Sequence, residues 1–186
     1  MSLAATLRCP CDKAQLRPAF AYDVPPAGET KFDLGGSPYA RGYDVCSTCG
    51  HWFGRHDLDL SRLYESDYVD ATYGGAEGMR ARFEKIMALP PERSDNRART
   101  ARVAAFARTP GKLLDFGAGL GVFPAAMSEL GWHAWALEPD ARTRAHLLSL
   151  GLAGAVGTMA QCAPAAPFDA ISFNKVLEHI EDPVAT

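Results

Sequence analysis

Short apolar runs alternate with helix-like segments in the second half of the chain. The run that begins at Lys112 reads as a buried strand, which breaks into a glycine-rich turn and then opens a helix. Residues 141–150 have a helical pattern, and Gly151 is a residue type that commonly ends helices. The pattern predicts four strands, over residues 112–115, 133–137, 153–159 and 168–173.

Residues 77–108 mix Arg and Glu with large apolar residues, which indicates helices. Pro90-Pro91 interrupts them, Asp95 is expected to start the second one, and residues 109–111 are expected to end it.

The turn after the first predicted strand carries three alternating glycines, Gly117, Gly119 and Gly121. Glycine lets the backbone bend sharply and bring its N–H groups against a ligand, where a Cβ would collide. Asp115 ends the first apolar run, and Glu138 ends the second one about 20 residues further on. If the two strands lie side by side, both carboxylates reach one crevice, where Glu138 would accept the hydroxyls of a ribose. The alternative is a turn that only connects a strand to a helix.

The glycine spacing distinguishes between cofactors, because a dinucleotide fingerprint places its third glycine three positions after the second. The D-x-G-x-G-x-G pattern from Asp115 to Gly121 instead resembles motif I of class I S-adenosylmethionine-dependent methyltransferases. The segment from Phe168 to Pro183 resembles the fourth strand of these enzymes and the loop beyond it, with F-D-x-I followed by L-E-H-I-x-D-P. The resemblance implies that Asp115 and the glycines hold the methionine part of S-adenosylmethionine, and that Glu138 holds its ribose.

The loop after the fourth strand carries the candidate catalytic residues. Asn174 is expected at the carboxyl end of that strand, lining the crevice, whereas Asp169 lies at the other end and is interpreted as structural. The resemblance implies that His179 acts as a general base on the acceptor, oriented by Glu178. A histidine whose ordinary pKa is near 6.5 suits that role at neutral pH. In the alternative interpretation, Glu178 and His179 only cap and orient the loop.

Many relatives place an acid after the third strand to bind the adenine amino group. This chain has Thr158, Met159 and Gln161 there. Backbone groups with Met159, or Gln161 itself, are the candidates for that contact.

Two close pairs of cysteines stand in the N-terminal part, Cys9 with Cys11 and Cys46 with Cys49. Four cysteines in two pairs are typical of a zinc ribbon, in which the metal replaces a core too small to hold the fold. Because four sulfur ligands leave no open coordination position, the zinc is expected to be structural.

The Cys9-x-Cys11 pair is closer than the usual C-x-x-C, so His51 or His56 is an alternative ligand. Disulfides and free thiols are the alternatives to a metal, and the N-terminus shows no secretory signal that would favour disulfides. Cys162 is predicted to be unpaired and at least partly buried.

A zinc ribbon, a tyrosine-rich link and a methyltransferase core together resemble bacterial methyltransferases with an N-terminal zinc-binding domain, some of which methylate nucleotide-linked sugars. The comparison implies that Tyr64, Tyr68 and Tyr73 contact substrate or cofactor. The alternative is an ordinary packing face.

The net charge is −3 and the pI is about 5.9, so no broad basic surface is expected. The arginines of residues 93–102 are interpreted as a solvated helix face, and nucleic acid is not expected as a partner. No apolar stretch reaches the length of a membrane span, and the cysteine chemistry is that of a reducing compartment. We therefore expect a cytoplasmic protein.

The predicted function is S-adenosylmethionine-dependent methyl transfer to a small-molecule acceptor, such as a nucleotide-linked sugar or a natural-product intermediate. One alternative is a ribosomal-RNA methyltransferase, which would need a basic surface. The other is a non-enzymatic zinc-ribbon binding module on a degenerate half-domain.

The predicted fold class is α/β: the first four strands of a Rossmann-like doubly wound parallel sheet, in the order 3-2-1-4, preceded by a small zinc-ribbon β domain and a helical linker. The expected domains are residues 1–60, 61–110 and 111–186. Because class I methyltransferase sheets have seven strands, the chain is expected to be a fragment whose fourth strand is an exposed edge.

Overall fold

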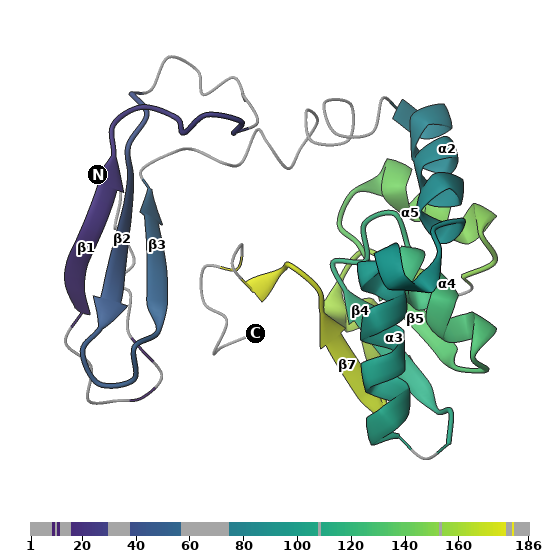
Figure 1. Ribbon diagram of the computed structural model, residues 1–186. Helices are drawn as coiled ribbons and strands as arrows, with labels where there is room; N and C mark the ends of the chain where they lie inside the picture. Colours follow the sequence, from purple (N-terminus) through teal and green to yellow (C-terminus); the bar gives the residue numbers. More distant parts are fainter. Residues whose placement is uncertain are drawn as a thin grey trace. The chain divides into compact units, whose positions relative to one another are not determined.

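The computed structural model describes residues 9, 11, 16–29, 38–56, 75–107, 109–152, 154–177 and 180. The chain forms two compact units, one containing the described residues up to 56 and one containing residues 75–177 (Figure 1).

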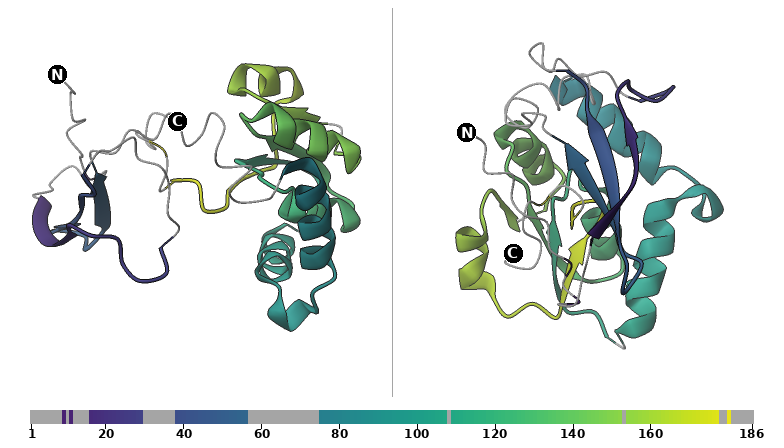
Figure 2. Two further views of the ribbon diagram at one scale, coloured as in Figure 1. Left: turned by 90° about the horizontal axis from the view of Figure 1, so that it is seen from above. Right: turned by 90° about the vertical axis from the view of Figure 1, so that its left-hand side faces the viewer.

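The smaller unit is a three-stranded antiparallel sheet in the order β1-β2-β3 (Figure 2). Its strands are β1 (Leu16–Tyr22), β2 (Arg41–Cys46) and β3 (Trp52–His56). The pairing of β1 with β2 shifts between Pro18 and Phe20, so one extra residue of β1 forms a bulge. Pro18 has no N–H to donate, which fits a strand at the edge of a sheet.

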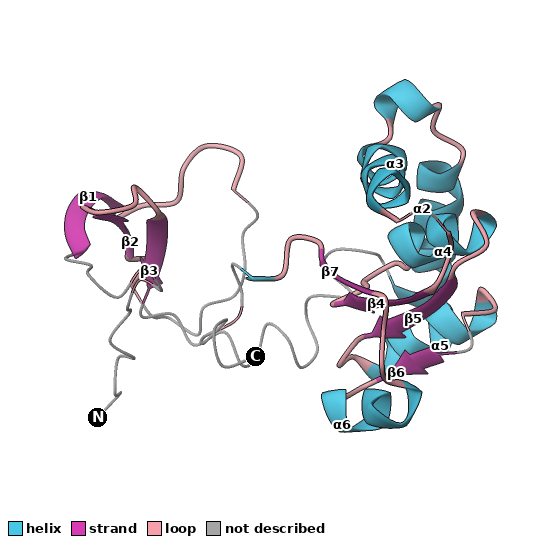
Figure 3. Cartoon of the chain, turned by 90° about the horizontal axis from the view of Figure 1, so that it is seen from below, coloured by secondary structure: helices cyan, strands magenta, loops and turns pink. Residues whose placement is uncertain are grey.

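The larger unit is built on a parallel sheet in the order β6-β5-β4-β7 (Figure 3). The strands are β4 (Lys112–Phe116), β5 (His133–Leu137), β6 (Gly154–Val156) and β7 (Ala170–Phe173). In chain order this is 3-2-1-4, so the predicted α/β fold is confirmed. β7 lies at one edge of the sheet.

Helices flank this sheet: α2 (Gly75–Met87), α3 (Asp95–Phe106), α4 (Val122–Glu129), α5 (Ala141–Ser149) and α6 (Met159–Cys162), with short 3₁₀ turns η2 (Pro91–Arg93) and η3 (Ala163–Ala165). As predicted, α3 begins at Asp95, because the Ser94 side chain accepts the N–H of Arg97 at 3.3 Å.

The central strand β4 is buried on both faces. Leu113 packs with Phe123 and Met127 of α4 on one face. Its neighbour Leu114 packs with Cys162 of α6 on the other. Successive residues of a strand point to opposite faces, so an unbroken apolar run was needed for this arrangement.

Two strands are shorter than predicted. β6 ends at Val156 because Thr158 is the N-cap of α6, where its side chain and that of Gln161 form a capping box. β7 begins at Ala170, two residues later than predicted, and the preceding Phe168 packs its ring edge-on against Trp135.

None of the helices in the described part of the chain has the length and apolar composition that a membrane span requires.

Candidate functional site

The glycine-rich turn has a backbone that only glycine adopts readily. Gly117, Gly119 and Gly121 have φ angles of +69°, +51° and +74°, all in the left-handed region. The N–H groups of Gly117 and Ala118 donate to the Leu137 carbonyl at 2.8 and 3.1 Å. The turn therefore lies at the carboxyl ends of β4 and β5.

The glycines of this turn have different surroundings. A Cβ on Gly121 would lie 2.4 Å from Leu147 Cδ2, so this residue packs the start of α4 against α5. A Cβ on Gly117 would lie 2.6 Å from Val176 Cγ2. Gly121 is buried, whereas Gly117, Ala118 and Gly119 are only half-buried. The first part of the turn is thus the part that a ligand can reach.

Glu138 meets this turn directly. Its Oε2 accepts the N–H of Gly119 at 3.0 Å, and its Oε1 accepts the N–H of Asp140 at 3.4 Å. Burial raises the pKa of Glu138, although the two backbone N–H groups act against this. The acid predicted to bind a ribose therefore contacts the backbone of the glycine turn directly.

Asp115 lies at the end of β4 and is only 2% exposed. Its Oδ1 accepts two hydrogen bonds from the end of β7, from Ser172 Oγ at 2.6 Å and from Asn174 Nδ2 at 2.9 Å. Burial raises the pKa of Asp115 to about 6, and the two donors partly offset that rise. No donor in the described part of the chain reaches Oδ2.

Ser172 is a site residue that the sequence interpretation missed. It pairs with Asp115 across the β4–β7 ladder and stands two positions before Asn174. Alternate residues of a strand share a face, so the assignment of Asn174 to the crevice carried the signal that would have identified Ser172.

The chain leaves β7 through an unusual backbone conformation. Lys175 has a φ of +59°, in the left-handed region that a non-glycine residue rarely occupies. Val176, the next residue, lies against Gly117. Glu178 and His179, the predicted catalytic pair, lie outside the described residues, as do Tyr64, Tyr68 and Tyr73.

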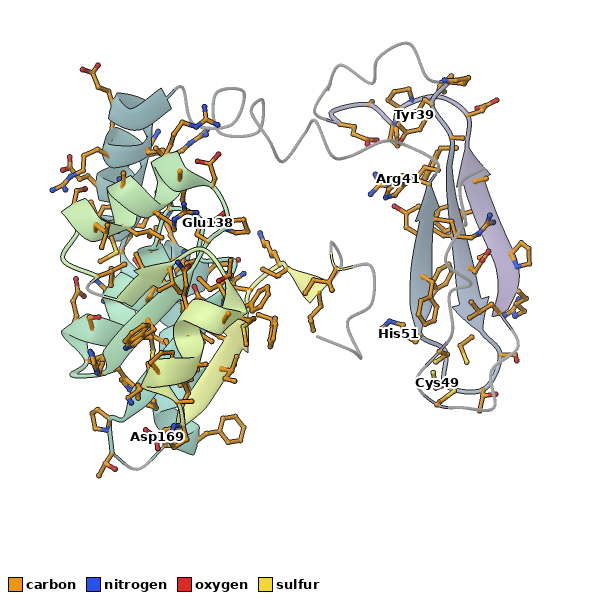
Figure 4. All side chains as sticks on the ribbon, turned by 180° about the vertical axis from the view of Figure 1, so that it is seen from behind. Tyr39, Arg41, Cys49, His51, Glu138 and Asp169 are labelled. Carbon is orange, nitrogen blue, oxygen red and sulfur yellow. The ribbon has the colours of Figure 1, made fainter. Side chains whose placement is uncertain are left out.

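Asp169 is placed at the opposite end of the sheet from Glu138 (Figure 4). Its Oδ2 accepts the backbone N–H of Lys112, the first residue of β4, at 2.7 Å. This carboxylate links the start of β4 to the residue before β7 and lies away from Glu138.

Two further polar side chains of the larger unit are occupied by contacts within the fold. Gln161 Oε1 accepts the N–H groups of Gly157 and Thr158 at 2.8 and 3.1 Å, so this oxygen caps α6. His146, which was assigned no role, is buried with its Nε2 3.2 Å from the Leu120 carbonyl oxygen. Met159 is exposed at the start of α6.

The four predicted metal ligands converge in the smaller unit. Cys9, Cys11, Cys46 and Cys49 place their sulfur atoms within 4.8 Å of one another, and none forms a disulfide. The Sγ atoms of Cys9 and Cys49 are 3.4 Å apart, and those of Cys11 and Cys46 are 3.6 Å apart. Both members of the unusually close Cys9-x-Cys11 pair therefore reach the cluster.

This cluster fits a zinc ion. Four sulfurs at about 2.3 Å from a tetrahedral zinc stand about 3.8 Å apart. Cys46 Sγ also accepts the N–H groups of Thr48 and Cys49, both at 3.4 Å, and these bonds help to lower its pKa to about 6. The first cause of that shift is the N–H of Cys49. A sulfur held in this way is prepared to bind a cation as a thiolate. Cys162 lies apart from the cluster, buried beneath β4 and β5.

A model of one protein family, described as a methyltransferase domain, matches residues 89–186. The match covers slightly more than half of the 186 residues and includes all four strands of the larger sheet. It also includes the glycine turn, Asp115, Glu138, Ser172 and Asn174. No curated protein matches the chain.

Proposed function

Because the chain belongs to the methyltransferase domain family, we propose that it transfers a methyl group from S-adenosylmethionine to a small-molecule acceptor. The contact between Glu138 Oε2 and the Gly119 N–H carries this proposal. It brings the acid that would bind the ribose to the turn that would hold the rest of the cofactor. The acceptor would be a nucleotide-linked sugar or a natural-product intermediate, as the resemblance implies.

Glu138 retains the capacity to bind two hydroxyl groups. Each of its carboxylate oxygens accepts one backbone N–H, and a carboxylate oxygen has about two acceptor positions. A ribose presents two neighbouring hydroxyls, which one carboxylate can accept together.

Asp115 is suited to the amino-acid part of the cofactor. Ser172 and Asn174 fix its Oδ1, while Oδ2 accepts nothing from the described residues. An ammonium group placed against Oδ2 would pair with the buried charge and lower the pKa of Asp115. The half-buried Gly117 and Gly119 would let the same ligand approach the backbone closely.

The chemistry of the step is divided between cofactor and protein. S-adenosylmethionine supplies a methyl group that its sulfonium already activates. The protein has to align the acceptor and remove its proton, and we assign the proton to His179, oriented by Glu178. The four-cysteine cluster would hold zinc and stabilise the smaller sheet, without an open position for substrate.

Isothermal titration of the full chain with S-adenosylhomocysteine tests this function. We expect saturable binding and a loss of affinity of about tenfold or more in Glu138→Ala, because two hydrogen bonds to a charged acceptor are removed. Glu138→Gln keeps the size and one acceptor oxygen and should bind with intermediate affinity.

Glu92→Ala removes an exposed glutamate of η2 and is the matched control, which should bind like the wild type. Absence of binding by a folded wild-type chain contradicts the proposal. Equal affinity of Glu138→Ala and wild type contradicts it as well.

A further inference from the structure

One face of the smaller sheet collects aromatic side chains. Residues directly opposite each other on paired strands point to the same face. The pairing places three rows on the Tyr43 face: Arg17, Val45 and Trp52, then Phe20, Tyr43 and Gly54, then Tyr22, Arg41 and His56. The bulge in β1 brings Arg17 onto the same face as Phe20. We call this set the aromatic face.

The rings of this face contact one another and remain open to solvent. Phe20 stacks on Tyr43 with 4.8 Å between ring centroids, and it lies 5.8 Å from Trp52 and 5.5 Å from Tyr22. Phe20, Tyr22 and Trp52 are 46%, 40% and 54% exposed. Rings packed in this way form a rigid surface, and their exposed area is available for stacking.

The centre of the third strand carries no side chain on this face, because the residue there is Gly54. The atom nearest to a Cβ built on Gly54 is Tyr43 Cε1 at 3.8 Å, an ordinary van der Waals contact, so the Tyr43 ring lies against this glycine. The more exposed rings, Phe20 and Trp52, are the ones on which a further flat ring can stack.

The aromatic face carries basic side chains and no acidic ones. Its nine positions include Arg17, Arg41 and His56 and no Asp or Glu. Arg41 lies 5.5 Å from the Tyr43 ring centroid and pairs with Glu29 at 3.1 Å. Arg17 is exposed and forms no ion pair with a described residue. The opposite face carries the pair of Arg55 and Asp44, with 2.7 Å between Nε and Oδ2.

We propose that the aromatic face binds a nucleotide, with the base stacked on Trp52 and Phe20 and the phosphates at Arg17. Every base offers a flat face to an aromatic ring, and a guanidinium pairs with phosphate in a bidentate manner. Arg17 and Trp52 stand on the two outer strands, about 10 Å apart, because neighbouring strands lie about 4.8 Å apart. A nucleoside diphosphate spans such a distance between its base and its phosphates.

A single nucleotide fits these observations better than RNA. Polymer binding relies on many phosphate contacts and a broad basic surface, whereas the chain has a net charge of −3 and the face has one arginine free of a described ion pair. Only the link to catalysis rests on the proposed function: a nucleotide held here would be the nucleotide part of the methyl acceptor.

Titration of the zinc-loaded full chain with uridine diphosphate and thymidine diphosphate tests the inference. We expect saturable binding of at least one probe and a shift of the Trp52 indole N–H signal in NMR spectra, assigned with Trp52→Phe. Trp52→Ala and Phe20→Ala should each lower the affinity about tenfold, because stacking contributes about 1–3 kcal/mol per base. Arg17→Gln should weaken binding of the diphosphate but not of the nucleoside, and Arg17→Lys should restore part of the loss.

Val24→Ala is the control for loss of an exposed apolar side chain outside the strands, since Val24 is 65% exposed, and it should not change the affinity. Zinc content verifies that each variant keeps the fold of the sheet. The inference is overturned if neither diphosphate binds, or if Trp52→Ala binds them with wild-type affinity. It is also overturned if a uridine-rich RNA oligomer binds while the diphosphates do not. A chain that binds S-adenosylhomocysteine but neither diphosphate overturns this inference alone, whereas the reverse result overturns the proposed function alone.

Discussion

Asp115 is a buried carboxylate whose charge the fold compensates only in part. Two donors reach its Oδ1, yet burial raises its pKa to about 6, above the ordinary value near 3.9. Between these two pH values the folded state holds a proton that the unfolded chain has released. The free energy of unfolding therefore falls as the pH rises through this window. In the ionised form, the charge of Asp115 is only partly compensated, so a cationic ligand can pair with it.

The first prediction concerns this titration. Asp115→Asn cannot ionise, so the free energy of unfolding of the wild type relative to the variant should fall by about 2–3 kcal/mol between pH 4 and pH 7. Urea unfolding in a Trp52→Phe background measures it, because the remaining tryptophans, Trp132 and Trp135, belong to the larger unit.

Glu138 and the cysteines titrate in both proteins, so their own contributions cancel in the difference, and only the repulsion between Glu138 and Asp115 remains in it. Parallel stability profiles for the two proteins would show that Asp115 does not titrate in this range.

The glycine turn combines a special backbone conformation with a close contact. Gly117 and Gly151 have nearly the same left-handed conformation, with φ of +69° and +79°. A Cβ would meet Val176 at 2.6 Å on Gly117 but nothing within 4 Å on Gly151. A comparison of alanine substitutions at the two positions therefore separates the cost of backbone strain from the cost of a steric clash.

We predict that Gly151→Ala lowers the stability by about 1–2 kcal/mol, which is the strain of an L-residue in this conformation. Gly117→Ala should lose more stability than that, because the loop after β7 has to move. Denaturant unfolding measures both losses of stability. Similar losses in the two variants would mean that Val176 moves aside without a measurable cost. Gly117→Ala should also weaken binding of S-adenosylhomocysteine, whereas Gly151→Ala should not.

The sequence predicted the order of the elements better than their ends. The apolar runs of β4 and β5 identified the sheet because burial on both faces leaves no alternation to misread. The end of β6 depends on a capping box between Thr158, which was assigned to the strand, and Gln161, which was considered as an adenine contact. Local side-chain chemistry of this kind competes with a strand and ends it.

The geometry of the glycine turn could be predicted because alternating glycines have few other uses than an unusual backbone conformation. The positive φ angles at Gly117, Gly119 and Gly121 are what the alternating glycines indicated. Ser172 was missed because serine has many uses, and the aromatic face was missed because the bulge in β1 breaks the period of two. The roles assigned to Glu178 and His179 stay predictions, because both residues lie outside the described part of the chain.

At the scale of the whole molecule, the two units use different sources of stability. The larger unit has apolar cores on both faces of its sheet. The smaller sheet exposes much of its aromatic surface and gathers four sulfurs at one end. Sheets of this size with little core commonly need a metal for their fold, and we propose that zinc at the four cysteines has this role.

We therefore predict that removal of zinc unfolds the smaller unit alone. In a chelator-treated chain, or in Cys46→Ser, hydrogen exchange should become fast in β2 and stay slow in β4 and β5. The wild type should bind about one zinc per chain, and Cys162→Ser should keep that content because Cys162 lies outside the cluster. Loss of protection in both units would contradict this separation.

The central claim is that the turn at Gly117–Gly121 and Glu138 together form a site for S-adenosylmethionine. A crystal structure of the chain with S-adenosylhomocysteine tests it most directly. We predict that the ligand lies across the half-buried part of the turn, with its ribose hydroxyls within 3.2 Å of the Glu138 carboxylate. A ligand bound elsewhere, or a Glu138 side chain that makes no contact with the ribose, would contradict the claim.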